Sequence, residues 1–277
     1  MTAIALTIAG SDSGGGAGIQ ADLKTFSALG VYGASAITAL TAQNTVGVQG
    51  IHNAPPEFVV QQIESVLSDL DVGAIKIGML SNAVIIEAVA TVLQRYRHIP
   101  IVLDPVMVAT SGDALLEQSA ISALREHLLP LAAVITPNFP ELAMLCGDTV
   151  ANNEEAMIAQ GKVLLDLGSS SVLVKGGHAE GADSTDLLLS WCLVKRYTVP
   201  RIKTRNVHGT GCTLSSAIAA GLAKGLPLFE AVGEAKAYVT KAIGAAQALG
   251  IGKGQGPVHH FHAWWNHNSL PSPPKNG

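Results

Sequence analysis

Short apolar segments alternate with helical patterns along most of the chain. Several apolar segments predict buried strands, because each is too short for a helix and is closed by Gly, Pro or Asp. They are residues 4–9, 75–78, 101–104, 133–136 and 172–175. Between them, apolar residues recur at helical spacing over 19–29, 58–70 and 84–93. This alternation predicts an α/β fold with a mostly parallel sheet covered by helices on both faces.

The later part of the chain has a different pattern. Residues 185–193 and 197–203 predict a β-hairpin or a pair of edge strands, and helices follow from about 212 to 224 and from 230 to 248. No linker divides the chain, so we expect a single domain over residues 1–265. The proline-rich end, 266–277, predicts a flexible tail.

Composition narrows the class of protein. The chain is 48% hydrophobic and 14% charged, yet its apolar windows are broken well before the ~18 residues that a membrane span needs. The apolar surplus therefore indicates a large buried core. A net charge of −4 and few aromatic residues give no sign of a nucleic-acid surface.

Cysteine usage and the chain start indicate a cytoplasmic protein. Cys146, Cys192 and Cys212 are too few and too scattered for a disulfide framework or a zinc site. The first residues lack the basic region of a signal peptide and lead directly into an apolar strand.

Two glycine-rich segments could hold a ligand. Residues 10–18 follow the first strand and precede a helix, but they match neither G-x-G-x-x-G nor a P-loop, so a simple tight turn is equally compatible. Residues 206–213 open a later helix, whose N-terminal amides form a ready anion site. The same position should stabilise a Cys212 thiolate, although a buried, inert cysteine is the alternative.

Charged residues follow three of the predicted strands. Asp104 and Glu141 suit a water-rich Mg²⁺ shell beside phosphates, or else each is a helix cap or first-turn acid. Lys175 could reach phosphate oxygens or extend to the surface. The carboxyl ends of parallel strands are where ligands bind in such sheets.

Histidines gather near the C-terminus, at His259, His260, His262 and His267. A metal cluster is one interpretation. We favour a solvated surface, because no carboxylate accompanies them and the predicted tail is adjacent.

Taken together, the motifs occur in an order that is specific. They are 7–13 (TIAGSDS), 15–25 (GGAGIQADLKT), 76–80 (KIGML), 103–107 (LDPVM), 135–138 (ITPN), 174–177 (VKGG) and 208–213 (HGTGCT). Over about residues 3–262 the chain closely resembles the hydroxymethylpyrimidine/phosphomethylpyrimidine kinases of thiamine biosynthesis, members of the ribokinase-like superfamily.

The resemblance implies a fold and an activity. The fold would be a three-layer α/β/α domain with about eight mostly parallel strands, assembled as a homodimer. The activity would be ATP-dependent phosphorylation of 4-amino-5-hydroxymethyl-2-methylpyrimidine to its monophosphate, then to its diphosphate. Mg²⁺ would accompany ATP.

The resemblance also assigns roles to residues. Those placed against the pyrimidine are Gly10, Asp22, Gln43, Met79 and Val106. Those placed near the ATP phosphates are Lys175 and the amides of Gly209, Thr210, Gly211 and Cys212. Asp104 and Glu141 would lie near Mg²⁺. Cys212 stands where the wider superfamily has an aspartate that acts as the base.

The chain departs from the family pattern at two positions. Relatives often have serine at Gly14, and many have glutamate at Gln43, which bears on how the ring is held. Two rival functions also remain. One rival is a pyridoxal or pyridoxine kinase of the same subfamily. The other is a non-catalytic pyrimidine-binding sensor, against which the presence of Asp104, Lys175 and Cys212 argues.

Overall fold

The central feature of the computed structural model, which describes residues 1–107, 118–178 and 181–265, is an eight-stranded sheet. The expected tail 266–277 lies outside the described residues. The strands of the sheet are β1 (Ile4–Ala9), β2 (Tyr32–Ile37), β5 (Ala74–Ile77), β6 (Ile101–Leu103), β7 (Val134–Ile135), β8 (Val172–Val174), β9 (Asp183–Ser190) and β10 (Leu193–Pro200). Their order is β10-β9-β8-β7-β6-β5-β1-β2, and every pair in this sheet is parallel except the two that β9 makes with β8 and β10. The mostly parallel sheet expected from the sequence is confirmed.

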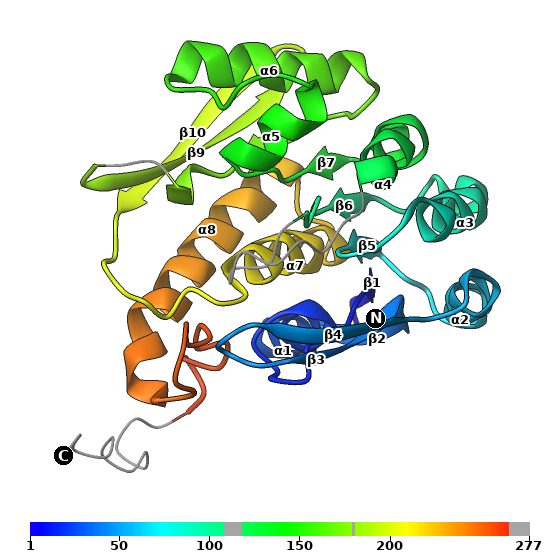
Figure 1. The fold of residues 1–277 in the computed structure, drawn as a ribbon, viewed down its shortest axis with the longest axis horizontal. Helices are drawn as coiled ribbons and strands as arrows, with labels where there is room; N and C mark the ends of the chain where they lie inside the picture. The colour runs from blue at the N-terminus through cyan, green and yellow to red at the C-terminus, as the bar shows by residue number, and fades with distance from the viewer. Residues whose placement is uncertain (108–117, 179–180, 266–277) are drawn as a thin grey trace.

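Helices cover both faces of this sheet (Figure 1). The helices are α1 (Gly18–Ala28), α2 (Pro56–Leu67), α3 (Ala83–Leu93), α4 (Gln118–Ala123), α5 (Phe139–Cys146), α6 (Glu154–Asp166), α7 (Thr210–Ala223) and α8 (Leu228–Ala245). One hydrophobic cluster packs the five helices from α2 through α6 against one face of the sheet. A second cluster packs α1, α7 and α8 against the other face. The three-layer α/β/α architecture is thereby confirmed. None of the helices in the described part of the chain is long and apolar enough to cross a membrane.

Side chains alternate between the two faces along the central strands. In β1, Leu6 and Ile8 pack in the α2 to α6 cluster, while Thr7 points to the opposite face and reaches Asp22 of α1. In β5 the polar residue on that opposite face is Lys76, which is fully buried beside Ala74 in the strand. Polar groups of the central strands therefore lie beneath α1 and α7.

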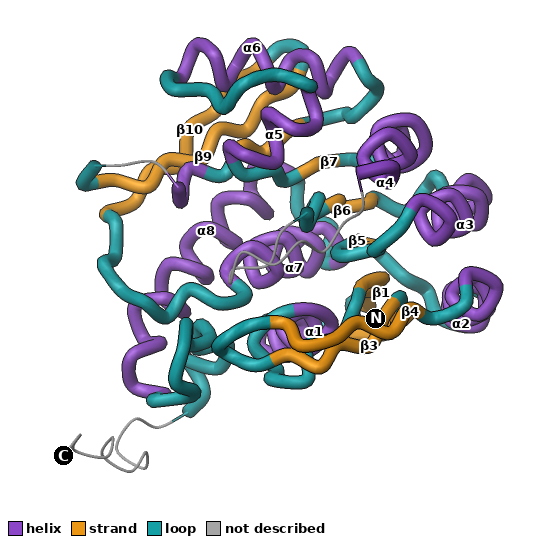
Figure 2. The backbone as a smooth tube through the Cα atoms, viewed as in Figure 1, coloured by secondary structure: helices purple, strands orange, loops and turns teal. Residues whose placement is uncertain are grey.

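A second, two-stranded sheet lies beside the main one. It consists of β3 (Ala39–Gln43) and β4 (Val48–Asn53), which are antiparallel. The hairpin that they form extends toward the C-terminal loops (Figure 2). The apolar segment 34–40 is divided between β2 and β3, because the chain leaves the main sheet at Thr38. The backbone N–H of Thr38 donates to Ala9 and its hydroxyl donates to the Met79 carbonyl at 2.7 Å. These bonds anchor the corner from which β3 departs.

The late hairpin is present but begins earlier than its sequence pattern suggests. Its strands, β9 and β10, are joined by a turn at Trp191 and Cys192. Trp191 is exposed in this turn. Apolar residues at the turn extend the strand pattern past the point where the chain reverses, which explains the difference.

Candidate active site

A cavity of about 650 Å³ opens where the parallel strands end. Most of the site residues expected from the sequence line it. They are Gly10, Gln43, Met79, Asp104, Val106, Glu141, Lys175, Gly209, Thr210, Gly211 and Cys212. Segments far apart in the sequence therefore meet in one cavity.

Asp22 does not line the cavity. Its fully buried carboxylate accepts hydrogen bonds from Thr7 and Ser216, both at 2.6 Å, and pairs with Lys76 at 2.8 and 2.9 Å. These donors occupy both oxygens, so we reassign Asp22 from contact with the ring to support of Lys76. Lys76 itself lines the cavity.

Lys76 is not among the site residues expected from the sequence, although its position carries a signal. A lysine inside a buried apolar strand needs a partner, because an unpaired buried charge is very costly. Although burial alone would lower the pKa of Lys76, Asp22 raises it above the ordinary value. Lys76 is therefore a fixed positive charge under the cavity.

One end of the cavity holds a lysine between two carboxylates. Lys175 Nζ lies 2.8 Å from Asp104 Oδ1 and 3.5 Å from Glu141 Oε2. Thr136 and Ser215 donate to the two oxygens of Asp104 at 3.0 and 3.1 Å. All three charged groups project from the carboxyl ends of neighbouring strands or from the helix that follows, as the sequence predicts.

The two carboxylates differ in their protonation behaviour. Burial would raise the pKa of Asp104, but Lys175 and Lys76 outweigh it and lower that pKa. Burial and the charge of Asp104 raise the pKa of Glu141, against the opposing effect of Lys175. Added positive charge at this end would favour the ionised form of Glu141.

Glu141 has a structural function as well. It accepts a hydrogen bond from the Asn138 backbone N–H at 2.7 Å, and Asn138 accepts one from the Glu141 N–H at 2.9 Å. This reciprocal pair is a capping box at the start of α5. The cap engages Glu141 Oε2, the same oxygen that faces Lys175. The other oxygen, Oε1, is left for a metal ion, so the cap interpretation and the ligand interpretation of Glu141 are compatible.

The start of α7 forms a backbone anion site beside these charges. The helix begins at Thr210, and its N-cap Gly209 has φ +79°. A side chain at Gly211 would place its Cβ 3.4 Å from Lys175 Nζ, which shows how close the turn comes to the lysine. Backbone amides and an ammonium group therefore converge on one place, a suitable setting for phosphate oxygens.

Cys212 does not have the activated thiolate that its position at a helix start suggests. Burial raises the pKa of its thiol to about 11, while Lys76 and the Gly18 backbone N–H oppose the rise. The expectation of a stabilised thiolate is wrong, because burial outweighs the opposing effects of Lys76 and the Gly18 N–H.

Apolar side chains and one amide form the other end of the cavity. Met79 lies against Gly10, where a Cβ would come within 3.1 Å of the methionine methyl carbon. Val106 and Gln43 complete this end. The Thr41 hydroxyl donates mainly to the Ser11 carbonyl at 2.8 Å and lies 3.3 Å from the Gln43 side-chain oxygen. Among the described residues, the Gln43 amide therefore keeps its donor and most of its acceptor capacity for a ligand.

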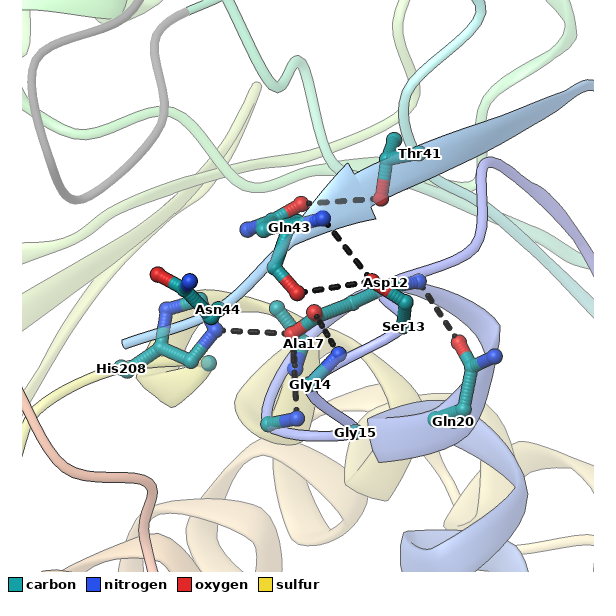
Figure 3. Close-up of polar contacts among 12 residues, drawn as sticks. Asp12, Ser13, Gly14, Gly15, Ala17, Gln20, Thr41, Gln43, Asn44 and His208 are labelled. Carbon is teal, nitrogen blue, oxygen red and sulfur yellow. Dashed lines mark hydrogen bonds and ion pairs between the residues drawn. The ribbon is translucent and has the colours of Figure 1, made fainter. Parts of the chain in front are cut away.

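The glycine-rich turn beside this end is organised by Asp12 (Figure 3). Its buried carboxylate accepts hydrogen bonds from the N–H groups of Gly14, Gly16 and Ala17, and it pairs with His208 at 2.8 Å. The sequence reading assigns no function to Asp12 or His208. Their pairing joins residues 196 positions apart, which no local pattern reveals.

The C-terminal histidines are not a solvated surface. His259 and His260 are 1% and 4% exposed, and His260 Nε2 lies 3.1 Å from the Thr213 hydroxyl. Burial lowers the pKa of His260 to about 3. Among the described residues, no group of three or more His, Cys, Asp or Glu side chains is arranged to hold a metal ion, and His267 lies outside those residues.

Comparison with known proteins gives one consistent relationship. A family model described as phosphomethylpyrimidine kinase matches residues 12–259. The hydroxymethylpyrimidine/phosphomethylpyrimidine kinase of Rhizobium meliloti (strain 1021) is 60% identical over 265 residues, which is 96% of this chain and 99% of the relative. The thiamine biosynthesis bifunctional protein ThiED of Geobacter sulfurreducens is 52% identical over 258 residues, covering 93% of this chain and 52% of that longer protein.

A solved structure shares the fold at lower identity. The crystal structure of an ADP complex of Bacillus subtilis pyridoxal kinase aligns with a TM-score of 0.87 and 36% identity, covering 96% of this chain and all of that one. The chain is thus more similar in sequence to the pyrimidine kinase from Rhizobium meliloti than to this pyridoxal kinase.

Proposed function

The chain belongs to the phosphomethylpyrimidine kinase family, and from this premise we propose how its cavity is divided between the two substrates. It phosphorylates the hydroxymethylpyrimidine of thiamine biosynthesis to the monophosphate and then to the diphosphate, with ATP as co-substrate. The observation that carries this function is 60% identity to a pyrimidine kinase over nearly the whole of both chains, against 36% to a pyridoxal kinase.

The pyrimidine occupies the end of the cavity lined by Gly10, Gln43, Met79 and Val106. A flat ring suits the apolar surface of Met79 and Val106, and Gly10 permits close approach. The Gln43 amide can donate to a ring nitrogen and accept from the neighbouring amino group. The hydroxymethyl group then points toward Cys212.

The ATP phosphates occupy the end at Lys175 and the 209–212 turn. Lys175 and the amides of Gly209, Gly211 and Cys212 neutralise charge on the transferring phosphoryl group, whereas the expected Thr210 amide donates to the Val207 carbonyl at 3.2 Å. Asp104 and Glu141 fit Mg²⁺, which is typically held by one or two carboxylates together with phosphates and water. When bound, Mg²⁺ would neutralise phosphate charge at this end.

Transfer requires placement more than covalent catalysis by the protein. The hydroxymethyl oxygen forms a bond to the γ-phosphorus as the bond to the ADP oxygen breaks, and the hydroxyl proton is released. Cys212 is placed to accept the hydrogen bond of that hydroxyl. As a thiol it orients the hydroxyl and the proton passes to solvent; in the small deprotonated fraction the thiolate takes the proton. In the second step an oxygen of the monophosphate is the nucleophile.

A coupled assay of ADP release tests this function. The pyrimidine and its monophosphate should both be turned over, with kcat/KM well above that for pyridoxal. Preference for pyridoxal would favour the vitamin B6 kinase alternative. Isothermal titration that detects pyrimidine binding without turnover would instead identify a sensor.

We also propose a homodimer in the cytoplasm. Tyr32, Leu40 and Ile51 expose large apolar surface on β2, β3 and β4, which a second copy could cover. The three cysteines are free thiols, as in a reducing compartment. Sedimentation equilibrium should give twice the chain mass of 28.5 kDa.

A further inference from the structure

Two turns from opposite ends of the chain are held together by one buried pair. The glycine-rich turn 12–17 contributes Asp12, and His208 comes directly before the phosphate-binding turn 209–212. His208 Nε2 lies 2.8 Å from Asp12 Oδ2, and the side chains are 8% and 1% exposed (Figure 3). Neither Asp12 nor His208 is among the residues proposed to bind the pyrimidine or ATP.

Asp12 determines the shape of its own turn. Its carboxylate accepts from the N–H groups of Gly14 at 2.8 Å, Gly16 at 3.0 Å and Ala17 at 2.8 Å, in addition to His208. These donors keep the pKa of Asp12 below its ordinary value although burial would raise it. The pair is therefore built on a carboxylate that stays ionised.

His208 brings the second turn into backbone contact with the first. A Cβ at Gly16 would lie 2.3 Å from His208 Cδ2, and a Cβ at Gly209 would lie 1.8 Å from the Gly16 carbonyl oxygen. No side chain fits between the two turns. The location of the 209–212 amides is consequently fixed by the turn that Asp12 shapes.

The glycine-rich turn is tied to the ring-binding strand as well. The Ser13 hydroxyl donates to the Gln43 carbonyl at 2.7 Å, and the Gln43 N–H donates back to the Ser13 oxygen at 2.8 Å (Figure 3). Two hydrogen bonds thus join Gln43 to Ser13, the chain itself joins Ser13 to Asp12, and the Asp12 carboxylate is hydrogen-bonded to His208. This connection spans the two ends of the cavity that hold the two substrates.

We propose that Asp12 and His208 are positioning residues for phosphoryl transfer. The pair holds the phosphate-binding turn at a fixed distance from the ring-binding strand, so that the hydroxymethyl oxygen and the γ-phosphorus meet in line. This inference rests on the proposed function. Because each substrate keeps its own contacts when the pair is broken, the loss should fall on kcat more than on either KM.

The test compares two substitutions of one residue. His208→Leu removes the donor to Asp12 and should lower kcat for the pyrimidine by about 10- to 100-fold, with both KM values within about threefold of wild type. His208→Gln keeps an N–H donor at a similar reach and should restore kcat to within about threefold. Gln160→Leu is the control, since Gln160 is a buried, hydrogen-bonded residue of α6 away from the cavity.

The outcomes separate positioning from stability. Equal kcat in His208→Leu and wild type, measured well below either melting temperature, would overturn the proposal, as would equal losses in the Leu and Gln variants. If His208→Leu does not fold, Asp12→Asn, His208→Ala and their double variant decide, because each single change removes the Asp12–His208 bond. A double variant no worse than the poorer single variant supports the pair, and additive losses overturn it. Wild-type enzyme without pyrimidine turnover would instead refute the proposed function itself.

Discussion

At the scale of single residues, Cys212 shows burial outweighing local sequence. The start of α7 and the Gly18 N–H favour a thiolate, yet desolvation raises the pKa to about 11. The thiol is therefore protonated at neutral pH. Its contribution to catalysis depends on orientation of the substrate hydroxyl, or on the small fraction that is deprotonated.

Cys212→Ala should lower kcat by about 10²- to 10⁴-fold if the thiol takes the proton in the transition state. Steady-state kinetics with the pyrimidine measure this. Cys192→Ala, which changes an exposed cysteine in the β9–β10 turn, should leave kcat unchanged. Near-normal kcat in a folded Cys212→Ala variant would leave the backbone amides as the whole contribution of this turn.

Removal of the Lys175 ammonium should affect the nucleotide more than the pyrimidine. We expect Lys175→Ala to raise the KM for ATP by about tenfold or more, equivalent to at least ~1.4 kcal/mol, with a smaller change for the pyrimidine. Lys162→Ala, on the exposed side of α6, is the control. A rise confined to the pyrimidine KM would show that Lys175 faces the other substrate.

Gln43 should determine which ring is accepted. A 4-aminopyrimidine offers an N–H donor beside a ring-nitrogen acceptor, and pyridoxal has no such pair. Gln43→Met should lower kcat/KM for the pyrimidine by about 10- to 100-fold, since an orphaned buried group costs ~1–3 kcal/mol, and should spare pyridoxal. Gln61→Met on the exposed side of α2 is the matched control. Equal responses of both substrates would mean that Gln43 does not recognise the ring.

At the scale of elements, the sequence predicts the ends of strands better than the partners of side chains. Short apolar runs closed by Gly, Pro or Asp place the residues that line the cavity, because the carboxyl ends of parallel strands must meet. Thr38 was not predictable as a corner, since its anchor is the Met79 carbonyl in another strand. Asp22 likewise pairs with Lys76, 54 residues away, and hydrophobic periodicity carries no information about such pairs.

The contact between the two turns can be tested with a matched pair of glycines. Gly209 and Gly225 flank α7 with φ +79° and +84°, but only Gly209 meets a neighbour, the Gly16 carbonyl. Alanine at either site costs about 1–2 kcal/mol for the left-handed backbone. Gly209→Ala should be more destabilising than Gly225→Ala in urea unfolding, and it alone should lower kcat. If the two variants were equally destabilised and both kept normal kcat, the turns could separate without loss of function.

At the scale of the whole molecule, buried ion pairs concentrate around the cavity. Lys76–Asp22 and Lys175–Asp104 lie there, beside the hydrogen-bonded pair of His208 and Asp12. The residues come from strands, loops and helix α1, in both halves of the chain. Such pairs add little net stability, because desolvation offsets their attraction. Their concentration is therefore better explained by the reaction, which needs fixed charges around a phosphate.

His260 should make global stability depend on pH. Burial lowers the pKa of His260 to about 3, against 6.5 in the unfolded chain. Below pH 6.5 the unfolded chain therefore binds a proton that the native chain does not, and the free energy of unfolding falls as the pH falls toward 3. Between pH 8 and 5 this residue alone should account for about 2 kcal/mol of lost stability.

Urea unfolding of wild type and His260→Gln at both pH values isolates this contribution. At pH 8 the histidine is neutral in both states, so the difference between the two proteins there reports only packing and the hydrogen bond to Thr213. The loss between pH 8 and 5 should be about 2 kcal/mol smaller in the variant. Identical losses would show that His260 takes up its proton in the folded protein, and that the C-terminal segment opens locally to admit water before the whole molecule unfolds.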